Sequence, residues 1–482
     1  MTLAINTKKP VNFITAGVLI VLSIVMVLVL KSEFQSMQTK ETIYYGKNPN
    51  VVAVHRLSEW NENLQTTNNG AGDTLVYEIK GKEDGDTMII FGGVHANEPA
   101  GVISASWLVE NLHPNAGTVY VMTHTNQAGY TCTDPQEASP MFYTFETGAG
   151  ERTFRFGSRV TNPIYQWPDP DIYVHTSGMK LAGAETRNLN RCYPGIKDGT
   201  ITQQIAYALT TMVRDVDAAM VIDLHEASPE YKTINTTVYH SRGNDIAGYA
   251  VSFNIPQDMI DNSGKMGSDV APESLRGLSH IELGTWTDTL SLLMETSNPS
   301  QGREHGKTGS DLVVTGTDKF YERNQESVGL WDLTYGKIKT NGEDRPLSQR
   351  VARHLTFIAA LADAYNEEVG AAVEAASKVT TDEQKAAIFE PLGMGYSQIQ
   401  EDKNQYNAEE YKYAGQIIGL RRTGKLDLGI TLQGDANFYT HILDEVYSDL
   451  APDENALNSD ELWAMDASAF PVQIQNGKVI SK

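Results

Sequence analysis

The sequence predicts an α/β fold, because short apolar strand patterns alternate with longer amphipathic helix patterns between about residues 75 and 370. One of these strands, AAMVIDLH at 218–225, is apolar almost without interruption. Such a run is typical of a strand that is buried on both faces. A chain of 482 residues with 40% hydrophobic content can bury a large core around such a sheet.

The individual elements follow one another along this region. Strands are expected at TLVYEIK (74–80), TMIIFGG (87–93), GTVYVMT (117–123), AAMVIDLH (218–225), TTVYH (236–240) and TLSLLMET (289–296). Helices are expected at 99–112, where Pro99 opens the pattern, and at 201–216, 243–255 and 346–368. Two segments, about 132–185 and 300–345, do not fit the alternation and are interpreted as long ordered insertions.

The amino terminus predicts a membrane anchor. Lys8 and Lys9 precede an apolar run from about Val11 to Leu30, which is close to the roughly 20 residues that cross a bilayer as a helix. A cleaved signal usually has a shorter apolar core and a small-residue cleavage site. We therefore expect an uncleaved, single-pass anchor at 1–35, with the basic flank in the cytoplasm and the rest on the extracytoplasmic side.

Three further segments complete the predicted domain organisation. Residues 36–72 are polar and are interpreted as a linker, 73–370 as the catalytic-like domain, and 371–482 as a helical and mixed carboxyl-terminal extension.

The net charge of −23 and the lack of a Lys/Arg run exclude nucleic acid as an expected partner. The two cysteines, Cys132 and Cys192, could pair in an oxidising compartment, but sequence spacing alone does not decide this.

Candidate metal ligands follow two of the predicted strands. In FGGVHANEPAG, His95 and Glu98 lie on the turn between a strand and a helix, where open α/β sheets gather their ligands. In VIDLHEASPE, His225 ends another buried strand. Two histidines and one glutamate are one of the ligand sets of catalytic zinc sites. Asp223 or Glu226 could orient an imidazole, as ligating histidines commonly require.

Other polar residues could complete a hydrolytic site. Glu295 leaves the apolar strand TLSLLMET and is a candidate general base. GAETRNLNRCYPG places Arg187, Asn190 and Arg191 in a polar cluster, and arginine binds carboxylates as a planar fork. No G-x-S-x-G nucleophile motif occurs. The histidines that lack a ligand-like spacing are expected to have structural or surface roles: His124, His175, His240 and His280.

Four motifs in this order, GGVHANEPAG, NLNRCYPG, VIDLHE and LLMETSNP, resemble the succinylglutamate desuccinylase/aspartoacylase group of zinc metallocarboxypeptidase-like enzymes. The resemblance implies an α/β fold with a mixed central sheet flanked by helices, over about residues 75–370. It also implies zinc bound by His95, Glu98 and His225, with Glu295 as base and proton shuttle. Asn190 and Arg191 would hold a substrate carboxylate.

The sequence departs from the family pattern in three places. The aspartate that the family has directly before Leu-Asn-Arg is Asn188 here, and the insertion at 132–185 has no counterpart. The arginine that polarises the scissile carbonyl in the family has no fixed match; Arg187 is the first candidate, and Arg276 and Arg303 are the others.

Two classes of function follow from these observations. The first is a membrane-anchored zinc hydrolase that cleaves an amide or ester bond of a small N-acyl amino acid or of a peptide carboxyl end. The second is a non-catalytic, membrane-anchored binding or assembly module on the same fold. The intact set of ligand candidates together with Glu295 favours the enzyme, because a degenerate module is expected to lose at least one of them.

Overall fold

We analysed a computed structural model of the 482-residue chain. It describes residues 10–37, 41–133, 139–147, 150–229, 234–254, 267–272, 274–302, 305, 307–316, 346–399, 413–430, 472–475 and 478–481.

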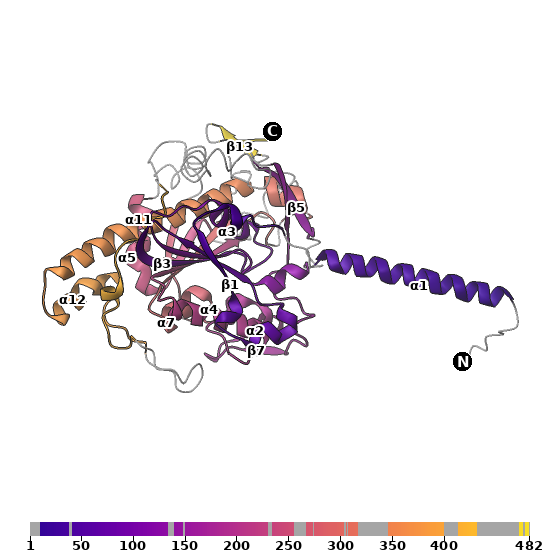
Figure 1. The fold of residues 1–482 in the computed structure, drawn as a ribbon, viewed down its shortest axis with the longest axis horizontal. Helices are drawn as coiled ribbons and strands as arrows, with labels where there is room; N and C mark the ends of the chain where they lie inside the picture. Colours follow the sequence, from indigo (N-terminus) through magenta and orange to yellow (C-terminus); the bar gives the residue numbers. More distant parts are fainter. Residues whose placement is uncertain are drawn as a thin grey trace, which may run out of the picture.

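A mixed eight-stranded sheet forms the centre of the fold (Figure 1). Its strands lie in the order β1 (Val51–Arg56), β2 (Leu75–Lys80), β4 (Ala116–Met122), β3 (Glu83–Phe91), β9 (Met220–Ala227), β12 (Leu290–Ser297), β10 (Thr236–Tyr239) and β11 (Gly267–Val270). Neighbouring strands from β4 to β12 are parallel, whereas β1, β2 and β10 pair antiparallel with their inner neighbours. The carboxyl ends of β3, β9 and β12 therefore meet at one edge of the sheet.

Helices cover both faces of this sheet, as the sequence predicts. On one face, α3 (Pro99–Asn111) and α11 (Leu347–Ser377) pack in one core with Met88 and Ile90 of β3. On the other face, α4 (Ile201–Asp215) and α7 (Ser279–Trp286) pack in a second core with Ile89 and Phe91. Alternate residues of a strand point to opposite faces, so one apolar strand supplies both cores. The predicted α/β class with a mixed, helix-flanked sheet is confirmed.

Smaller elements surround this framework. Within the insertion at 132–185 the described residues include two hairpins, β5 (Phe142–Thr147) with β6 (Gly150–Arg155) and β7 (Ile172–Val174) with β8 (Lys180–Ala182). The other α-helices are α2 (Asn63–Thr66), α5 (Asn244–Tyr249), α8 (Ser310–Thr315) and α12 (Asp382–Phe389), and β13 (Val472–Gln475) and β14 (Lys478–Ser481) form a separate antiparallel pair. Most of the second insertion, 300–345, lies outside the described residues.

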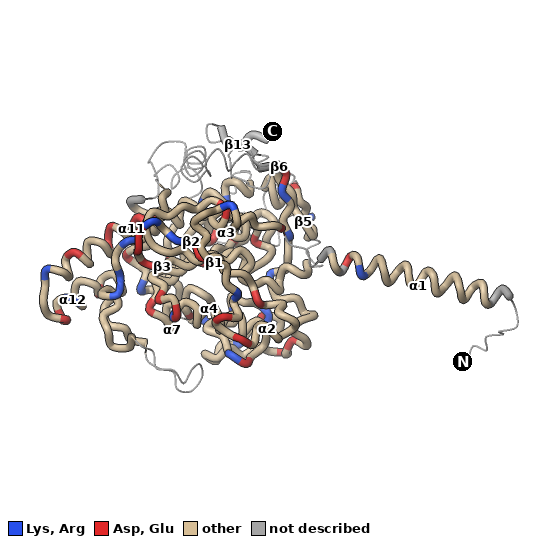
Figure 2. The backbone as a smooth tube through the Cα atoms, in the orientation of Figure 1, with Lys and Arg blue, Asp and Glu red and all other residues tan. Residues whose placement is uncertain are grey.

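The amino-terminal helix α1 (Pro10–Met37) extends away from the rest of the fold (Figure 1). Its segment Phe13–Glu33 has a mean hydropathy of 3.0 and none of it is buried. In Figure 2 this helix carries charge only near the end that approaches the domain. By length and composition α1 can cross a bilayer.

The segment after α1 belongs to the fold more than the predicted linker at 36–72 suggests. β1 forms an edge of the central sheet through antiparallel pairing with β2. Nearer the anchor, the Glu41 carboxylate lies 2.7 Å from the imidazole of His124, and Glu110 accepts a hydrogen bond from the amide of Tyr44. An edge strand buries few of its side chains, which explains why its mixed sequence resembles a linker.

The region after residue 370 also returns to the core. Helix α11 continues without a break to Ser377. Residues 413–430 then approach the sheet, where the backbone amides of Thr423 and Gly424 donate hydrogen bonds to the buried carboxylate of Asp86. The described residues 371–399 and 413–430 of the predicted carboxyl-terminal extension are therefore packed against the domain.

Candidate metal centre

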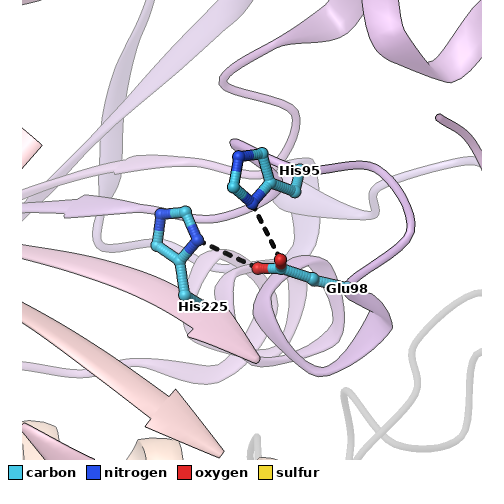
Figure 3. Close-up of side chains that lie close together, drawn as sticks. All are labelled: His95, Glu98 and His225. Atoms are coloured by element: carbon cyan, nitrogen blue, oxygen red, sulfur yellow. Dashed lines mark hydrogen bonds and ion pairs between the residues drawn. The ribbon is translucent and has the colours of Figure 1, made fainter. Parts of the chain in front are cut away.

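Three side chains meet at the carboxyl edge of the parallel strands (Figure 3). His95 and Glu98 lie on the turn between β3 and α3, and His225 lies near the end of β9. One ligand atom from each side chain lies within 4.8 Å of the others, and all three side chains are buried. Within the described part of the chain, this is the group of histidine, cysteine and acidic residues that could hold a metal ion.

The turn that presents these ligands depends on glycine. Gly93 has a φ of +67°, a backbone conformation that residues with a Cβ rarely adopt. A Cβ at Gly93 would also collide with the hydroxyl of Tyr130. The two glycines of FGGVH therefore let the backbone turn tightly after β3, so that His95 lies close to the end of β9.

Hydrogen bonds fix which nitrogen of His95 carries the proton. The Asn188 amide is oriented because its Oδ1 accepts from the backbone of Asn190 (3.0 Å) and its Nδ2 donates to Glu185 (2.8 Å). This same Oδ1 lies 2.9 Å from Nε2 of His95, so Nε2 must be the donor. Burial lowers the pKa of His95 to about 4, so the ring is neutral. Its Nδ1, on the other side of the ring, lies 2.8 Å from Glu98 Oε1.

His225 also has an oxygen atom facing each of its two ring nitrogens. Its Nδ1 lies 2.9 Å from Glu98 Oε2, and its Nε2 lies 2.9 Å from Asp223 Oδ2. The hydroxyl of Ser279 donates to this Asp223 oxygen at 2.5 Å. Burial alone would lower the pKa of His225, but the Asp223 and Glu98 carboxylates outweigh burial and raise it well above its usual value. Of the two predicted orienting carboxylates, it is Asp223 that faces the imidazole.

Glu98 is the centre of the group. Its Oε1 accepts a hydrogen bond from Gln301 (3.1 Å), and its Oε2 accepts one from the backbone amide of Glu226 (3.0 Å). Burial opposes ionisation, but the imidazoles of His95 and His225 lower the pKa of Glu98 well below its ordinary value. A buried carboxylate that faces two imidazole nitrogens is an electron-rich group suited to a divalent cation.

The candidate base Glu295 lies on the next strand. β12 runs parallel to β9, and Glu295 is in register with His225. Its Oε2 is buried and has no hydrogen-bond partner among the described residues. Burial raises the pKa of Glu295 to about 8, and the Glu98 and Asp223 carboxylates add to this rise against the opposing charge of His225. A cation bound at the ligand group would counter the rise.

Arg191 and Asn190 lie near the ligand group. The Arg191 side chain is 25% exposed, and its Nε lies 3.6 Å from Glu185. Burial lowers the pKa of Arg191, while Glu185 and Glu295 act to raise it, so its charge lies within reach of the candidate base. Asn190 Oδ1 accepts a hydrogen bond from the backbone amide of Ser279 (2.8 Å), which fixes the orientation of the Asn190 side-chain amide.

Arg187 is directed elsewhere. Its guanidinium forms a two-point ion pair with Asp169 (2.7 and 2.9 Å) and also donates to the carbonyl of Thr161 (2.8 Å). These contacts engage its fork, so Arg187 ties the insertion to the NLNR segment. Of the other arginines considered from sequence, Arg276 pairs with Glu282 at 2.7 Å, and Arg303 lies outside the described residues.

Arg159 is the site residue that the sequence did not single out. Its NH1 lies 3.2 Å from Glu98 Oε1 and 3.3 Å from His95 Nδ1, and its side chain is 38% exposed. A guanidinium therefore faces both a ligand carboxylate and a ligand imidazole. It comes from FRFGSRV in the insertion at 132–185, where no motif spacing marks it.

The remaining histidines and both cysteines lie outside the ligand group. His175 and His240 form hydrogen bonds to the backbone, and His280 is buried. Cys132 and Cys192 are free thiols, so the disulfide left open by the sequence does not form in this structure.

Comparisons with known proteins give structural similarities. No protein-family model matches the sequence, and no curated protein sequence matches it. Among solved structures, a succinylglutamate desuccinylase/aspartoacylase from Rhodobacter sphaeroides is 17% identical, with 48% of this chain and 53% of that chain covered and a TM-score of 0.30. The product-bound ectoine utilization protein EutE (DoeB) from Ruegeria pomeroyi is 15% identical, with 48% and 55% covered and a TM-score of 0.28.

A third match is the product-bound cell shape determinant protein Csd4 from Helicobacter pylori. It is 10% identical, with 60% of this chain and 54% of that chain covered and a TM-score of 0.34. The chain thus spans about half the length of each of these proteins. The solved structures that resemble this chain include members of the succinylglutamate desuccinylase/aspartoacylase family, which is the family that its four sequence motifs resemble.

Proposed function

We propose that this protein is a membrane-anchored, zinc-dependent hydrolase that cleaves an amide or ester bond of an N-acyl amino acid or of a peptide carboxyl end. The observation that carries the proposal is the meeting of His95, Glu98 and His225 at the sheet edge, with Glu295 on the adjacent strand. A binding module would need no unpaired carboxylate oxygen beside its ligand group, whereas hydrolysis needs a proton acceptor there.

The donor atoms fit zinc. His95 offers the Nδ1 lone pair, and Nδ1 of His225 and both Glu98 oxygens face the same region. Asn188 contacts Nε2 of His95, and Asp223 contacts Nε2 of His225. Such contacts to the second ring nitrogen are usual for ligating histidines. Three protein ligands leave a coordination position open, which is typical of catalytic zinc sites. When bound, zinc supplies Lewis acidity that makes water nucleophilic near neutral pH and polarises a carbonyl group.

Glu295 is proposed to move the proton. Its buried Oε2 is available to accept a proton from the attacking water and to pass it to the leaving nitrogen or oxygen. Burial raises the pKa of Glu295 to about 8, which supports a role in holding a proton and passing it on. A positive charge nearby would bring this pKa down toward the range in which one group can both accept and donate.

Two arginines are proposed to bind the substrate. Arg191 and the Nδ2 group of Asn190 would hold a substrate carboxylate, because charge-assisted hydrogen bonds are strong and directional. Arg159, whose guanidinium already faces Glu98, would stabilise the negative charge that develops on the scissile carbonyl oxygen. Arg187 has no role in this proposal, because Asp169 occupies its fork.

The experiment is a metal analysis followed by a substrate panel. Purified full-length protein in detergent should contain about one zinc per chain, and a chelator should abolish hydrolysis of N-acyl amino acids or short peptides until zinc is restored. Zinc binding without hydrolysis of any panel member would favour the non-catalytic module.

For the anchor, we propose that the domain lies on the extracytoplasmic side. External protease should then digest the domain in intact cells, and full protection of the domain would contradict this orientation.

A further inference from the structure

Helix α11 sends two buried side chains to the strand that carries His225. Arg350 and His354 are four residues apart and so lie on one face of the helix. His354 Nε2 lies 3.0 Å from the carbonyl oxygen of His225. Arg350 NH1 donates to Glu226 Oε1 at 2.5 Å, and its NH2 donates to the carbonyl of Val313 in α8. α11 therefore contacts β9 directly behind the candidate metal ligand.

Glu226 joins both ligand-bearing segments. Its Oε2 accepts the backbone amide of Ala100, in the first turn of α3 and two residues after Glu98 (2.8 Å). Its own backbone amide donates to Glu98 Oε2 at 3.0 Å. Its Oε1 accepts Arg350. One residue thus links the turn that carries Glu98, the strand that carries His225 and the helix that carries Arg350.

A buried ion pair of this kind is, by itself, weak evidence for a contribution to the stability of the fold. Glu226 is 2% exposed and Arg350 is 1% exposed, so both charges lose most of their hydration. Replacing such a pair by apolar residues is often neutral or stabilising. Its directional hydrogen bonds, on the other hand, fix the distance between β9 and the start of α3, on which the separation of His225 and Glu98 depends.

We infer that Arg350 and Glu226 are positioning residues that hold His225 and Glu98 at the spacing a metal ion requires. This inference rests on the proposed function, since it concerns the same metal centre. Neither residue would contact the metal or the substrate. Their effect would be on the affinity for zinc, because loss of groups that orient metal ligands typically weakens metal binding.

The chain contains a matched control. Glu110 and Arg152 form a second buried pair, with NH1 and Oε2 2.8 Å apart and side-chain exposures of 0% and 9%. Glu110 lies near the carboxyl end of α3, ten residues after Ala100, which is roughly 15 Å along a helix. This pair should therefore contribute to packing but not to the spacing of the metal ligands.

The test measures the zinc dissociation constant by chelator competition, and the unfolding midpoint of the zinc-free protein, on full-length chain in detergent. The variants are Arg350→Met, Glu226→Gln and the double variant, which removes both buried charges and protects against failure to fold. The controls are Arg152→Met, Glu110→Gln and their double variant. We expect about 10- to 100-fold weaker zinc binding for the first set and unchanged binding for the controls, whatever the unfolding midpoints.

Arg350→Lys adds a conservative substitution. Lysine can keep the charge opposite Glu226 but not the simultaneous contact with Val313, so it should restore part of the zinc affinity that Arg350→Met loses. Equal zinc affinity for the folded Arg350 variants and the control variants would overturn the inference. Failure of the wild-type chain to bind zinc would instead refute the proposed function, and the inference with it.

Discussion

Asn188 Oδ1 lies 2.9 Å from Nε2 of His95, at the position where the resembled family has an aspartate. The amide supplies the acceptor that His95 needs. It also donates through Nδ2 to Glu185 at 2.8 Å, which a carboxylate could not do. Asn188 therefore orients the His95 imidazole as an aspartate would. The hydrogen bond to Glu185 explains why an amide, and not a carboxylate, stands at this position.

The first prediction concerns this position. Asn188→Leu removes the acceptor and should weaken zinc binding by about 10- to 100-fold. Asn188→Asp should also weaken it, because the new carboxylate would face Glu185, and like charges at this distance repel. The double variant Asn188→Asp/Glu185→Gln relieves the repulsion and should recover the affinity. Chelator competition measures all three, and an Asn188→Leu variant with wild-type affinity would contradict the assignment.

Glu295→Gln is the second prediction. The substitution preserves the shape of the side chain but removes the proton acceptor, so zinc content should stay the same while kcat falls by about 10²- to 10⁴-fold. Glu59→Gln is the control and should leave kcat unchanged, because the Glu59 side chain is 53% exposed and faces His55 rather than a candidate site residue. A Glu295→Gln enzyme with a near wild-type rate would make Glu295 structural.

The third prediction concerns the charge of the substrate. If Arg191 and Asn190 hold a carboxylate, an amide analogue of the substrate should lose about 10- to 150-fold in kcat/KM, since hydrogen bonds to charged groups contribute about 1.5–3 kcal/mol. Arg191→Lys should reduce the discrimination, because a point charge cannot form the planar fork.

Arg187→Lys is the matched control for this experiment. It breaks the two-point pair with Asp169, so it should lower the unfolding midpoint while leaving the preference for the free acid intact. Equal kcat/KM values for the free-acid and amide substrates with the wild-type enzyme would show that the enzyme recognises a substrate group other than this carboxylate.

The fourth prediction is a pH dependence near the anchor. Burial alone would raise the pKa of Glu41, but the imidazole of His124 outweighs it and lowers the pKa below its ordinary value of 4.5. A carboxylate with a lowered folded pKa stabilises the fold above the unfolded pKa and loses this effect as the pH falls through the folded pKa. Glu41→Gln should therefore cost about 1.5–3 kcal/mol at pH 7.

At acid pH the Glu41 carboxyl group is protonated and is therefore neutral, as glutamine is. The free energy of unfolding of Glu41→Gln should then equal that of the wild type. Denaturant unfolding of the full-length chain at a series of pH values measures this difference. A constant difference from pH 7 down to below pH 4 would mean that the effect of Glu41 does not depend on its charge.

The sheet and the ligand group could be predicted because they depend on local patterns. Continuous apolar runs mark β3, β9 and β12 as buried strands, and parallel strands bring their carboxyl ends to one edge. His95, Glu98 and His225 follow directly from that geometry. The metal-ligand assignment itself stays a prediction until the metal is measured.

The surroundings of the ligands could not be predicted, because they depend on contacts between distant segments. Arg159 approaches Glu98 from 61 residues away, out of an insertion without motif spacing. Arg187 and Arg191 look equivalent in sequence, and only the position of Asp169 separates them. The strand β1 could not be recognised from its sequence, because an edge strand pairs through its backbone and needs few apolar side chains.

We propose that one zinc ion binds to His95, Glu98 and His225. Zinc-edge anomalous diffraction from crystals of the zinc-loaded protein tests it most directly. We expect one strong peak about 2.0–2.2 Å from Nδ1 of His95, Nδ1 of His225 and a carboxylate oxygen of Glu98. A peak bound by other residues, or no peak in zinc-saturated crystals, would contradict it.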